Sequence, residues 1–362
     1  MVRSAPRRIG IVELAGRGHR LVYVAILAEY ALESGDQVFF ITSRRVTSQA
    51  DYRVHVEASF PDIHVELLDT PDMQALKTLA ERLALTDVVI PDSDIWLPRL
   101  VAVIPSKLPF NLTLLVMRDP TLPEIELTLS RLLRRAAKIA ILRAIQAKRG
   151  PKWRVLKLKD PLPSLLVPGE TAPDPVAPRP ASLLVDAFRA ELPSAGFWFG
   201  VVGSISARKS PIAIALGALE SGLCGCGLAL IGPQNLDASM KQTLHDSLGQ
   251  LEAAGWKVFV KDVTLTDEEI SVAIAAMDCV VVAYTNPHPP STVSKSVALG
   301  TRTVVAGSRG TLGSAKQLGA TVVTADSSPE GLSEALVLAT TMDRPEPGKL
   351  LGRRDFAHAL LG

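Results

Sequence analysis

Short apolar runs alternate with amphipathic segments along the whole chain. Near the N-terminus, the apolar run 8–14 is followed by a glycine turn at 15–18, apolar residues at helical spacing over 19–34, and a second apolar run at 37–42. Short apolar runs bounded by turns are typical of buried strands, whereas a 3.6-residue spacing is typical of helices. This order predicts a βαβ unit of an open parallel sheet. Further strands are expected at 65–68, 87–90 and 112–117, and a further helix at 73–85.

The alternation is interrupted between 164 and 180, where five prolines occur. Proline cannot continue a helix or a central strand, so this segment predicts a linker. The pattern then restarts and predicts a second sheet. Its strands are expected at 197–202, 228–231, 257–260, 279–283, 303–306 and 321–323, with helices at 211–221, 239–254, 267–276 and 291–299.

The predicted fold class is therefore α/β, with two Rossmann-like doubly wound parallel-sheet domains facing a cleft. A chain of 362 residues with 47% hydrophobic content is long enough to bury two cores. The expected division is an N-terminal domain at 1–165, a proline-rich linker at 166–180, a C-terminal domain at 181–345, and a C-terminal helix within 346–362 that packs back toward the first domain.

Charge and cysteine content exclude several classes of protein. Thirty-nine Lys and Arg against 37 Asp and Glu leave a net charge of +2, which gives no global sign of nucleic-acid binding. Cys224, Cys226 and Cys279 are too few for a disulfide framework, and they lack the second ligand pair of a zinc site. The sequence shows neither a signal peptide nor a run of about twenty apolar residues. A cytoplasmic protein without a bound metal is expected.

One local stretch is strongly basic. Residues 130–159 contain many Lys and Arg but no acidic residue, and leucine and isoleucine occur between them. One interpretation is a solvated helix face followed by an edge strand. The other is a basic amphipathic helix at 130–148 that lies on anionic lipid at the inner face of a membrane. A nucleic-acid arm is disfavoured because aromatic residues that stack on bases are nearly absent there.

The glycine turn of the first βαβ unit is a candidate anion site. Gly16 and Gly18 allow backbone amides to approach a ligand at the start of a helix, where the partial positive charge suits phosphate or carboxylate. His19 stands at the mouth of that helix. A third glycine and an acidic residue after the second strand are missing, which disfavours a nicotinamide enzyme. A purely structural turn explains the glycines equally well.

Two polar segments in the second half follow predicted strands. Residues 203–211 bring a glycine, hydroxyls, Arg208 and Lys209 to a helix start, where a diphosphate fits. Residues 284–292 again deliver hydroxyls, from Ser291 and Thr292, to the start of a helix. Ordinary helix capping is the alternative for the second segment, although it does not account for the polar side chains clustered before the helix.

These segments resemble the GT-B glycosyltransferases whose C-terminal domain carries a G-R-L-x-x-x-K-G phosphate loop. Gly203, Lys209 and Ser210 fall on the first Gly, the Lys and the last Gly of that loop, while Ser204 stands in place of the Arg. Residues 295–306 are similar to the family's E-A-x-A-x-G-x-P-V-V-A segment, with Lys295 in place of the Glu and one extra residue after Gly300. Residues 230–232 resemble an earlier strand that ends in glycine.

The chain also departs from that family. Many members hold the donor sugar and ribose with two glutamates eight positions apart, and the matching residues here are Pro287 and Lys295. Neither side chain accepts a hydrogen bond from a hydroxyl. Some branches instead have a tyrosine, a serine-rich turn and a glycine-containing loop similar to residues 311–314. On that pattern, Ser291 and Thr292 hold the diphosphate.

The resemblance implies a glycosyltransferase that moves a sugar from a UDP- or GDP-sugar to a glycan or lipid-linked acceptor, in cell-surface polysaccharide or glycoconjugate synthesis. It implies no obligatory cofactor and no metal. The donor-site candidates are Gly16, Gly18, Gly203, Ser204, Arg208, Lys209, Gly232, Val263, Tyr284, Thr285, His288, Ser291, Thr292 and Lys295.

The N-terminal domain is expected to bind the acceptor through polar residues at strand ends. Arg118 and Asp119 are the acceptor candidates, and His19, Asp92 and Asp94 are the catalytic ones. An inverting transfer needs a base for the acceptor hydroxyl proton, whereas a retaining one does not. Two alternatives stay open, namely a catalytically silent GT-B homologue that binds a partner and a sugar-nucleotide epimerase.

Overall fold

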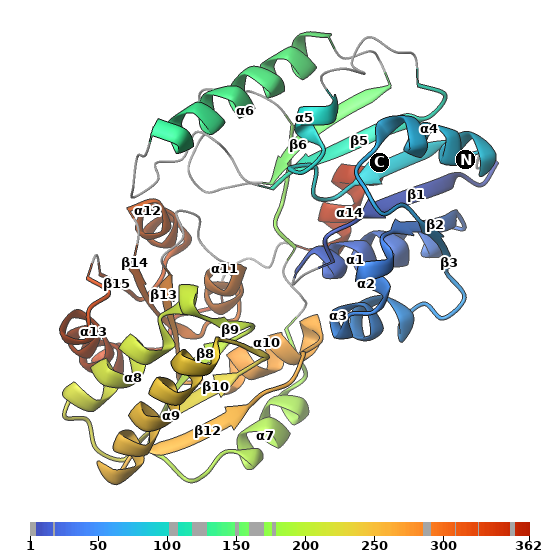
Figure 1. Cartoon of the computed structure of the whole chain (residues 1–362). Helices are drawn as coiled ribbons and strands as arrows, with labels where there is room; N and C mark the ends of the chain where they lie inside the picture. The colour runs from blue at the N-terminus through green and yellow to red at the C-terminus, as the bar shows by residue number, and fades with distance from the viewer. Residues whose placement is uncertain are drawn as a thin grey trace.

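The computed structural model shows two α/β lobes joined near the middle of the chain (Figure 1). We call the lobe built on the first sheet the N-lobe and the lobe built on the second sheet the C-lobe. The residues that the structure describes are 5–16, 19–100, 108–117, 129–148, 152–158, 170–175, 179–284, 291–307, 309–324, 326–347 and 352–362.

The N-lobe is built on a seven-stranded parallel sheet with the order β3-β2-β1-β4-β5-β6-β7. Its strands are β1 (Arg8–Glu13), β2 (Gln37–Thr42), β3 (His64–Leu67), β4 (Asp87–Ile90), β5 (Asn111–Val116), β6 (Trp153–Leu158) and β7 (Glu170–Ala172). Its helices are α1 (His19–Glu33), α2 (Arg44–Thr47), α3 (Ala50–Tyr52), the π-helical turn η1 (Arg53–Glu57), α4 (Met73–Arg82), α5 (Leu97–Leu100) and α6 (Leu129–Lys148). The sheet is covered by an apolar core on each face, because its strands are apolar nearly throughout.

The C-lobe repeats this plan with a six-stranded parallel sheet of order β12-β10-β8-β13-β14-β15. Its strands are β8 (Phe197–Val202), β10 (Cys226–Ile231), β12 (Lys257–Lys261), β13 (Cys279–Tyr284), β14 (Arg302–Gly307) and β15 (Val322–Thr324), beside a small pair β9 (Ile205–Ser206) and β11 (Gln234–Asn235). Its helices are α7 (Ser182–Glu191), the 3-10 turn η2 (Ala207–Lys209), α8 (Pro211–Glu220), α9 (Ala238–Ala253), α10 (Asp267–Ala276), α11 (Ser291–Ala298), α12 (Arg309–Leu318) and α13 (Pro329–Thr341). The predicted fold class of two doubly wound parallel sheets is confirmed.

Three local predictions were wrong. Glu170–Ala172 lies inside the predicted linker but forms strand β7 of the N-lobe, because a proline-poor triplet there can pair at the sheet edge. The predicted edge strand is β6, which instead lies between β5 and β7. Residues 311–314, compared with a glycine-containing loop, lie within helix α12, which tolerates two glycines, Gly310 and Gly313.

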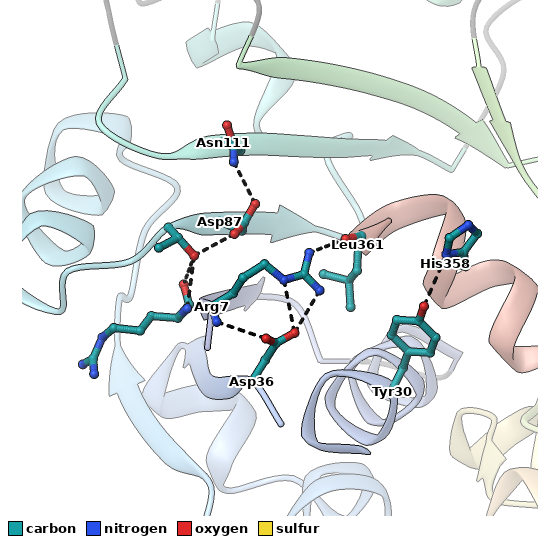
Figure 2. A network of polar contacts seen from close by, with 9 residues as sticks. Arg7, Tyr30, Asp36, Asp87, Asn111, His358 and Leu361 are labelled. Carbon is teal, nitrogen blue, oxygen red and sulfur yellow. Dashed lines mark hydrogen bonds and ion pairs between the residues drawn. The ribbon is translucent and has the colours of Figure 1, made fainter. Parts of the chain in front are cut away.

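The last helix, α14 (Arg353–Leu361), packs on α1 and β7 of the N-lobe. Figure 2 shows how its end is held. The Arg7 guanidinium donates to the carbonyl of Leu361 and pairs with the carboxylate of Asp36 at 2.9 Å, while Tyr30 Oη and His358 Nδ1 lie 3.3 Å apart. The chain therefore crosses back to its first lobe, while the residue boundaries of the domains stay a prediction.

Candidate active site

Each sheet has one point at which its strand order reverses. In the N-lobe this point lies between β1 and β4, and in the C-lobe between β8 and β13. Ligands of doubly wound folds bind outside the carboxyl ends of the strands at such a point, because the two flanking connections leave on opposite faces. Several predicted site residues follow β1, β4, β8 and β13. Those that the structure describes therefore lie at these two points.

In the C-lobe, Lys209 turns inward under the end of β8. Its Nζ donates to the carbonyl of Val202, the last residue of that strand, and its side chain is only 8% exposed. A small hollow beside it is lined by Val202, Lys209, Val281, Val282, Tyr284 and Thr292. The structure thus brings the predicted residues Lys209, Tyr284 and Thr292 together, at the start of α11.

The buried position of Lys209 disfavours its positively charged form. Burial and, to a smaller extent, the neighbouring Arg208 guanidinium together lower its pKa from 10.5 to about 7. Arg208 itself lies over the ring of Tyr284, with its Cζ 5.9 Å from the ring centroid. Lys209, Arg208 and the N-terminus of α11 all carry positive charge, and none of the described anionic side chains lies between them. A phosphate group placed there would be stabilised.

The loop that carries Lys209 is fixed by glycines. Gly203 has a φ of 86° and Gly232 a φ of 132°, and a Cβ built on Gly232 would lie 2.6 Å from the carbonyl oxygen of Gly203. The ends of β8 and β10 can approach so closely only because Gly232 lacks a side chain, and the positive φ of both residues favours glycine. Ser204 Oγ accepts a hydrogen bond from Asn235 at 2.8 Å, and Val263 is 43% exposed. Gly232 therefore has a structural role at the site.

Ser210 adopts a left-handed conformation, with φ 46° and ψ 46°. It occupies the place of the last glycine in the family's phosphate loop, and glycine adopts this conformation without strain. The backbone therefore keeps the geometry of a glycine although the residue has changed.

We expect Ser210→Gly to raise the free energy of unfolding by about 1 kcal/mol, since relief of the left-handed strain exceeds the added entropy of the unfolded chain. Urea denaturation would measure it. Ser206→Gly, at an extended position with φ −141°, is the matched control and should be destabilising. A loss of stability in Ser210→Gly would contradict the assignment of strain to this residue.

Lys295 does not stand free at the site. Its ammonium forms an ion pair with the carboxylate of Asp267, the first residue of α10, and the two residues are 6% and 8% exposed. No sequence pattern singled out Asp267, because Thr266 and Glu269 around it form an ordinary capping box. The predicted contact of Lys295 with a donor stays a prediction.

In the N-lobe, the important residue that sequence reasoning missed is Glu13. This last residue of β1 is 2% exposed, and its Oε1 accepts hydrogen bonds from the amides of Ala15 at 2.6 Å and Gly16 at 3.0 Å. Burial raises its pKa, although both amides and Arg20 oppose the rise. A glutamate inside the apolar run 8–14 was the available signal. The Gly16 amide, which was predicted to bind a ligand anion, therefore already donates a hydrogen bond to the carboxylate of Glu13.

The predicted acids after β4 are both in ion pairs. Asp92 is 4% exposed and pairs with Arg20 at 2.6 Å. Asp94 pairs with Lys138 of α6 at 3.0 Å, and its amide donates to Asp92 Oδ1. As a base, Asp92 would have to act from within its pair with Arg20. The catalytic roles of Asp92 and Asp94 stay predictions.

Several predicted site residues are beyond what the structure describes. Gly18, Arg118, Asp119, Thr285 and His288 lie outside the described residues, and so does the side chain of His19, whose backbone begins α1. Ser291, partly exposed, begins α11. Within the described ranges, no group of three His, Cys, Asp or Glu side chains is placed to hold a metal ion. None of the described helices combines the length and apolarity needed to cross a bilayer.

A comparison with known proteins finds solved structures that share the fold of this chain. No family model matches the sequence, and no curated protein matches it. Among solved structures, a glycosyltransferase from Rickettsia africae has 10% identity and a TM-score of 0.62, with 99% of this chain and 94% of that chain covered. Sucrose-phosphate synthase from Thermosynechococcus elongatus has 15% identity and a TM-score of 0.62, with coverage of 98% and 94%. Anabaena HepE in complex with UDP and glucose has 12% identity and a TM-score of 0.61, with coverage of 98% and 92%. This chain therefore has the GT-B fold of glycosyltransferases over nearly its whole length.

Proposed function

We propose that the protein is a glycosyltransferase that takes a sugar from a nucleoside-diphosphate sugar. The observation that carries this proposal is the buried Lys209 at the end of β8, which shares a hollow with Tyr284 and with Thr292 at the start of α11. A diphosphate placed there would meet a cation, a hydroxyl and the positive end of a helix, and these groups neutralise a leaving nucleotide as its charge develops.

The donor in this proposal is a UDP- or GDP-sugar. UDP is favoured, because HepE, which shares the fold, was solved with UDP and with UDP-glucose. Gly203, Arg208, Lys209, Ser291 and Thr292 would surround the diphosphate. The remaining donor candidates are Gly16, Gly18, Ser204, Gly232, Val263, Tyr284, Thr285, His288 and Lys295.

The N-lobe would bind the acceptor, a glycan or a lipid-linked sugar. Arg118 and Asp119 follow β5 in the sequence, and His19 begins α1, which follows β1 of the same sheet. In an inverting reaction, His19 or Asp92 would accept the proton of the acceptor hydroxyl. A role in polysaccharide synthesis at the cytoplasmic face of a membrane is the biological setting that we propose.

A nucleotide panel tests the function. UDP is expected to raise the melting temperature of the purified chain more than GDP or ADP, and UDP-sugars together with an acceptor mixture should give transfer products by mass spectrometry. Lys209→Met should lose both effects, whereas Lys241→Met on the exposed side of α9 should lose neither. Stabilisation without turnover would favour the silent homologue, and a changed sugar on the intact nucleotide would favour the epimerase. No stabilisation by any nucleotide would contradict all three.

The exposed start of α6 supports the membrane part of the proposal. Leu132 and Leu133 are 41% and 63% exposed, while Leu142 and Ile145 near the other end of the helix are buried in the N-lobe core. Apolar side chains beside the basic residues of 130–159 would enter a lipid surface that carries negative charge.

We expect the protein to sediment with vesicles that contain phosphatidylglycerol and not with pure phosphatidylcholine. The double change Leu132→Glu and Leu133→Glu should reduce the bound fraction at least about tenfold, since it removes apolar burial and adds repulsion from the lipid. Leu183→Glu with Leu184→Glu is the matched control, because these leucines of α7 are 77% and 43% exposed. Equal binding by both variants would contradict a role for α6.

A further inference from the structure

The N-lobe sheet ends in a strand that is paired on one side only. This strand, β3, pairs with β2 and is the last in the strand order, so none of the described strands pairs with its outer side. In Figure 1, β3 lies on the side of the N-lobe away from β6 and α6. Both of its apolar side chains are exposed, Val65 by 36% and Leu67 by 48%. An edge of this kind is a template for pairing with another strand.

The edge strand β12 of the C-lobe shows how such pairing is opposed. It begins and ends with a lysine, and Lys261 forms an ion pair with Glu191 of α7 at 2.9 Å. Charged side chains on an edge strand, lysine above all, disfavour pairing with another chain, and so does proline. Strand β3 contains neither residue, and its one acid, Glu66, is already paired with Arg82 of α4 at 2.7 Å. The outer side of β3 therefore lacks this protection.

The backbone of β3 determines which residues a new strand would meet. The amide of Leu68 donates to the carbonyl of Thr42 on β2 at 2.7 Å. Backbone groups alternate in direction along a strand, so those of Glu66 also point toward β2, whereas those of Val65 and Leu67 point outward. In an antiparallel pair, residues whose backbone groups point toward the partner strand lie opposite each other. Val65 and Leu67 would therefore provide the hydrogen bonds to a new strand.

A second copy of the chain can supply that strand. Two copies of β3 related by a two-fold axis run antiparallel, and the axis must pass through a residue, because an axis between residues would oppose outward-pointing to inward-pointing groups. An axis at Glu66 would place two glutamates opposite each other, and an axis at His64 would place Glu66 opposite Asp62. Both registers are disfavoured, since like charges directly opposite each other are destabilising. An axis at Leu67 would shift the pairing past the carboxyl end of β3.

An axis at Val65 gives a complementary pair on both faces of the strand. Val65 then faces its own equivalent, and Leu67 faces Ile63, which packs on the N-lobe core. These contacts cover the exposed apolar side chains of β3. On the other face, His64 lies opposite Glu66 twice, and an imidazole N–H can donate to each carboxylate.

We propose that β3 is the interface of a two-fold symmetric dimer, in which two N-lobe sheets join into one continuous sheet across Val65. Each copy contributes a strand of four residues, whereas a standard stable interface uses about 20–30 residues a side, so the dimer dissociates on dilution. The proposal concerns the end of the sheet opposite to β7 and does not depend on which ligand the protein binds.

Sedimentation velocity over a concentration series tests the dimer. A monomer–dimer equilibrium is expected, and Val65→Lys should weaken it at least about tenfold, because two lysines would face each other at the axis. Val260→Lys makes the same change on β12, where the valine is 43% exposed, and should leave the equilibrium unchanged. A chain that is monomeric at every concentration, or an equilibrium that Val65→Lys weakens no more than Val260→Lys does, would overturn the proposal.

Disulfide cross-linking tests the register in a chain whose exposed Cys224 is changed to serine. Val65→Cys should give a covalent dimer on oxidation, because the Cα atoms of a hydrogen-bonded antiparallel pair are about 5.5 Å apart, within the range of a disulfide. Leu67→Cys is the matched control, since its two copies would lie four residues apart along the strands, roughly 13 Å. Cross-linking through Leu67→Cys, or none through Val65→Cys at concentrations where the chain sediments as a dimer, would refute the pairing across Val65.

Discussion

Replacing Lys209 with methionine is expected to change the empty and the nucleotide-bound protein in opposite directions. The ammonium is buried under the end of β8, and burial together with Arg208 lowers its pKa to about 7. A methionine of similar length removes this desolvation cost, so the empty protein should gain roughly 1–3 kcal/mol. UDP binding should weaken about 10- to 100-fold, the usual range for loss of a hydrogen bond to a charged group.

Thermal melting with and without UDP measures both effects. The melting temperature of the empty Lys209→Met protein should rise, and the further rise that UDP causes in the wild type should be lost. Lys241→Met controls for the loss of one positive charge, because that lysine is exposed on α9. A lower melting temperature of the empty variant would show that Lys209 stabilises the empty protein, and undiminished stabilisation by UDP would show that it has no role in binding.

The depressed pKa of Lys209 also fixes the sign of a pH effect. The unfolded chain holds this proton up to about 10.5, whereas the folded protein releases it near 7. Between these values the unfolded state binds more protons, so this group makes the empty protein more stable as pH rises from 7 toward 10.5. A bound diphosphate favours the ammonium, so UDP affinity should fall over the same range. Calorimetry at pH 8 in two buffers of different ionisation enthalpy should detect proton uptake in the wild type and none in Lys209→Met.

The sequence was sufficient for the fold because the fold depends on local patterns. Strand β8 (Phe197–Val202) and helix α10 (Asp267–Ala276) begin and end as predicted, since a buried parallel strand is apolar throughout and a capping box marks a helix start. The convergence of Lys209 with Thr292 was also accessible, because both follow strands that flank the reversal of strand order.

The sequence was not sufficient where a residue's role depends on a partner far away in the chain. Glu13 lies within an apolar strand, Asp174 within a proline-rich connection and Asp267 within a capping sequence. Asp174 and Asp267 are defined by contacts with Tyr23 and Lys295 that only the tertiary structure creates, whereas Glu13 accepts hydrogen bonds from the nearby amides of Ala15 and Gly16. Strand β7 was missed for the same reason, because three residues pair at a sheet edge without a pattern of their own.

Replacing Arg20 with methionine is expected to destabilise the N-lobe more than any other single change proposed above. Arg20 pairs with Asp92 at 2.6 Å, and its charge also lowers the pKa of the buried Glu13. Asp92 is 4% exposed and Glu13 is 2% exposed, so neither carboxylate can exchange the lost cation for water. Breaking a buried pair by removing one partner costs about 3–5 kcal/mol. Urea denaturation at neutral pH should show a loss of this size.

The pH dependence of this loss identifies its cause. The pKa of Glu13 is already raised by burial, and without Arg20 it rises further, so folded Arg20→Met binds more protons than its unfolded chain over a wider range above pH 4.5. Its stability must then fall as pH rises through that range, and the deficit against the wild type should shrink on acidification from pH 7.5 to 5. Asp92→Asn in the same chain should recover part of the deficit at pH 7.5. If neither acidification nor Asp92→Asn reduces the deficit, Arg20 acts through packing of its aliphatic stem. The conformation at the carboxyl end of β1 would then depend on packing and not on charge.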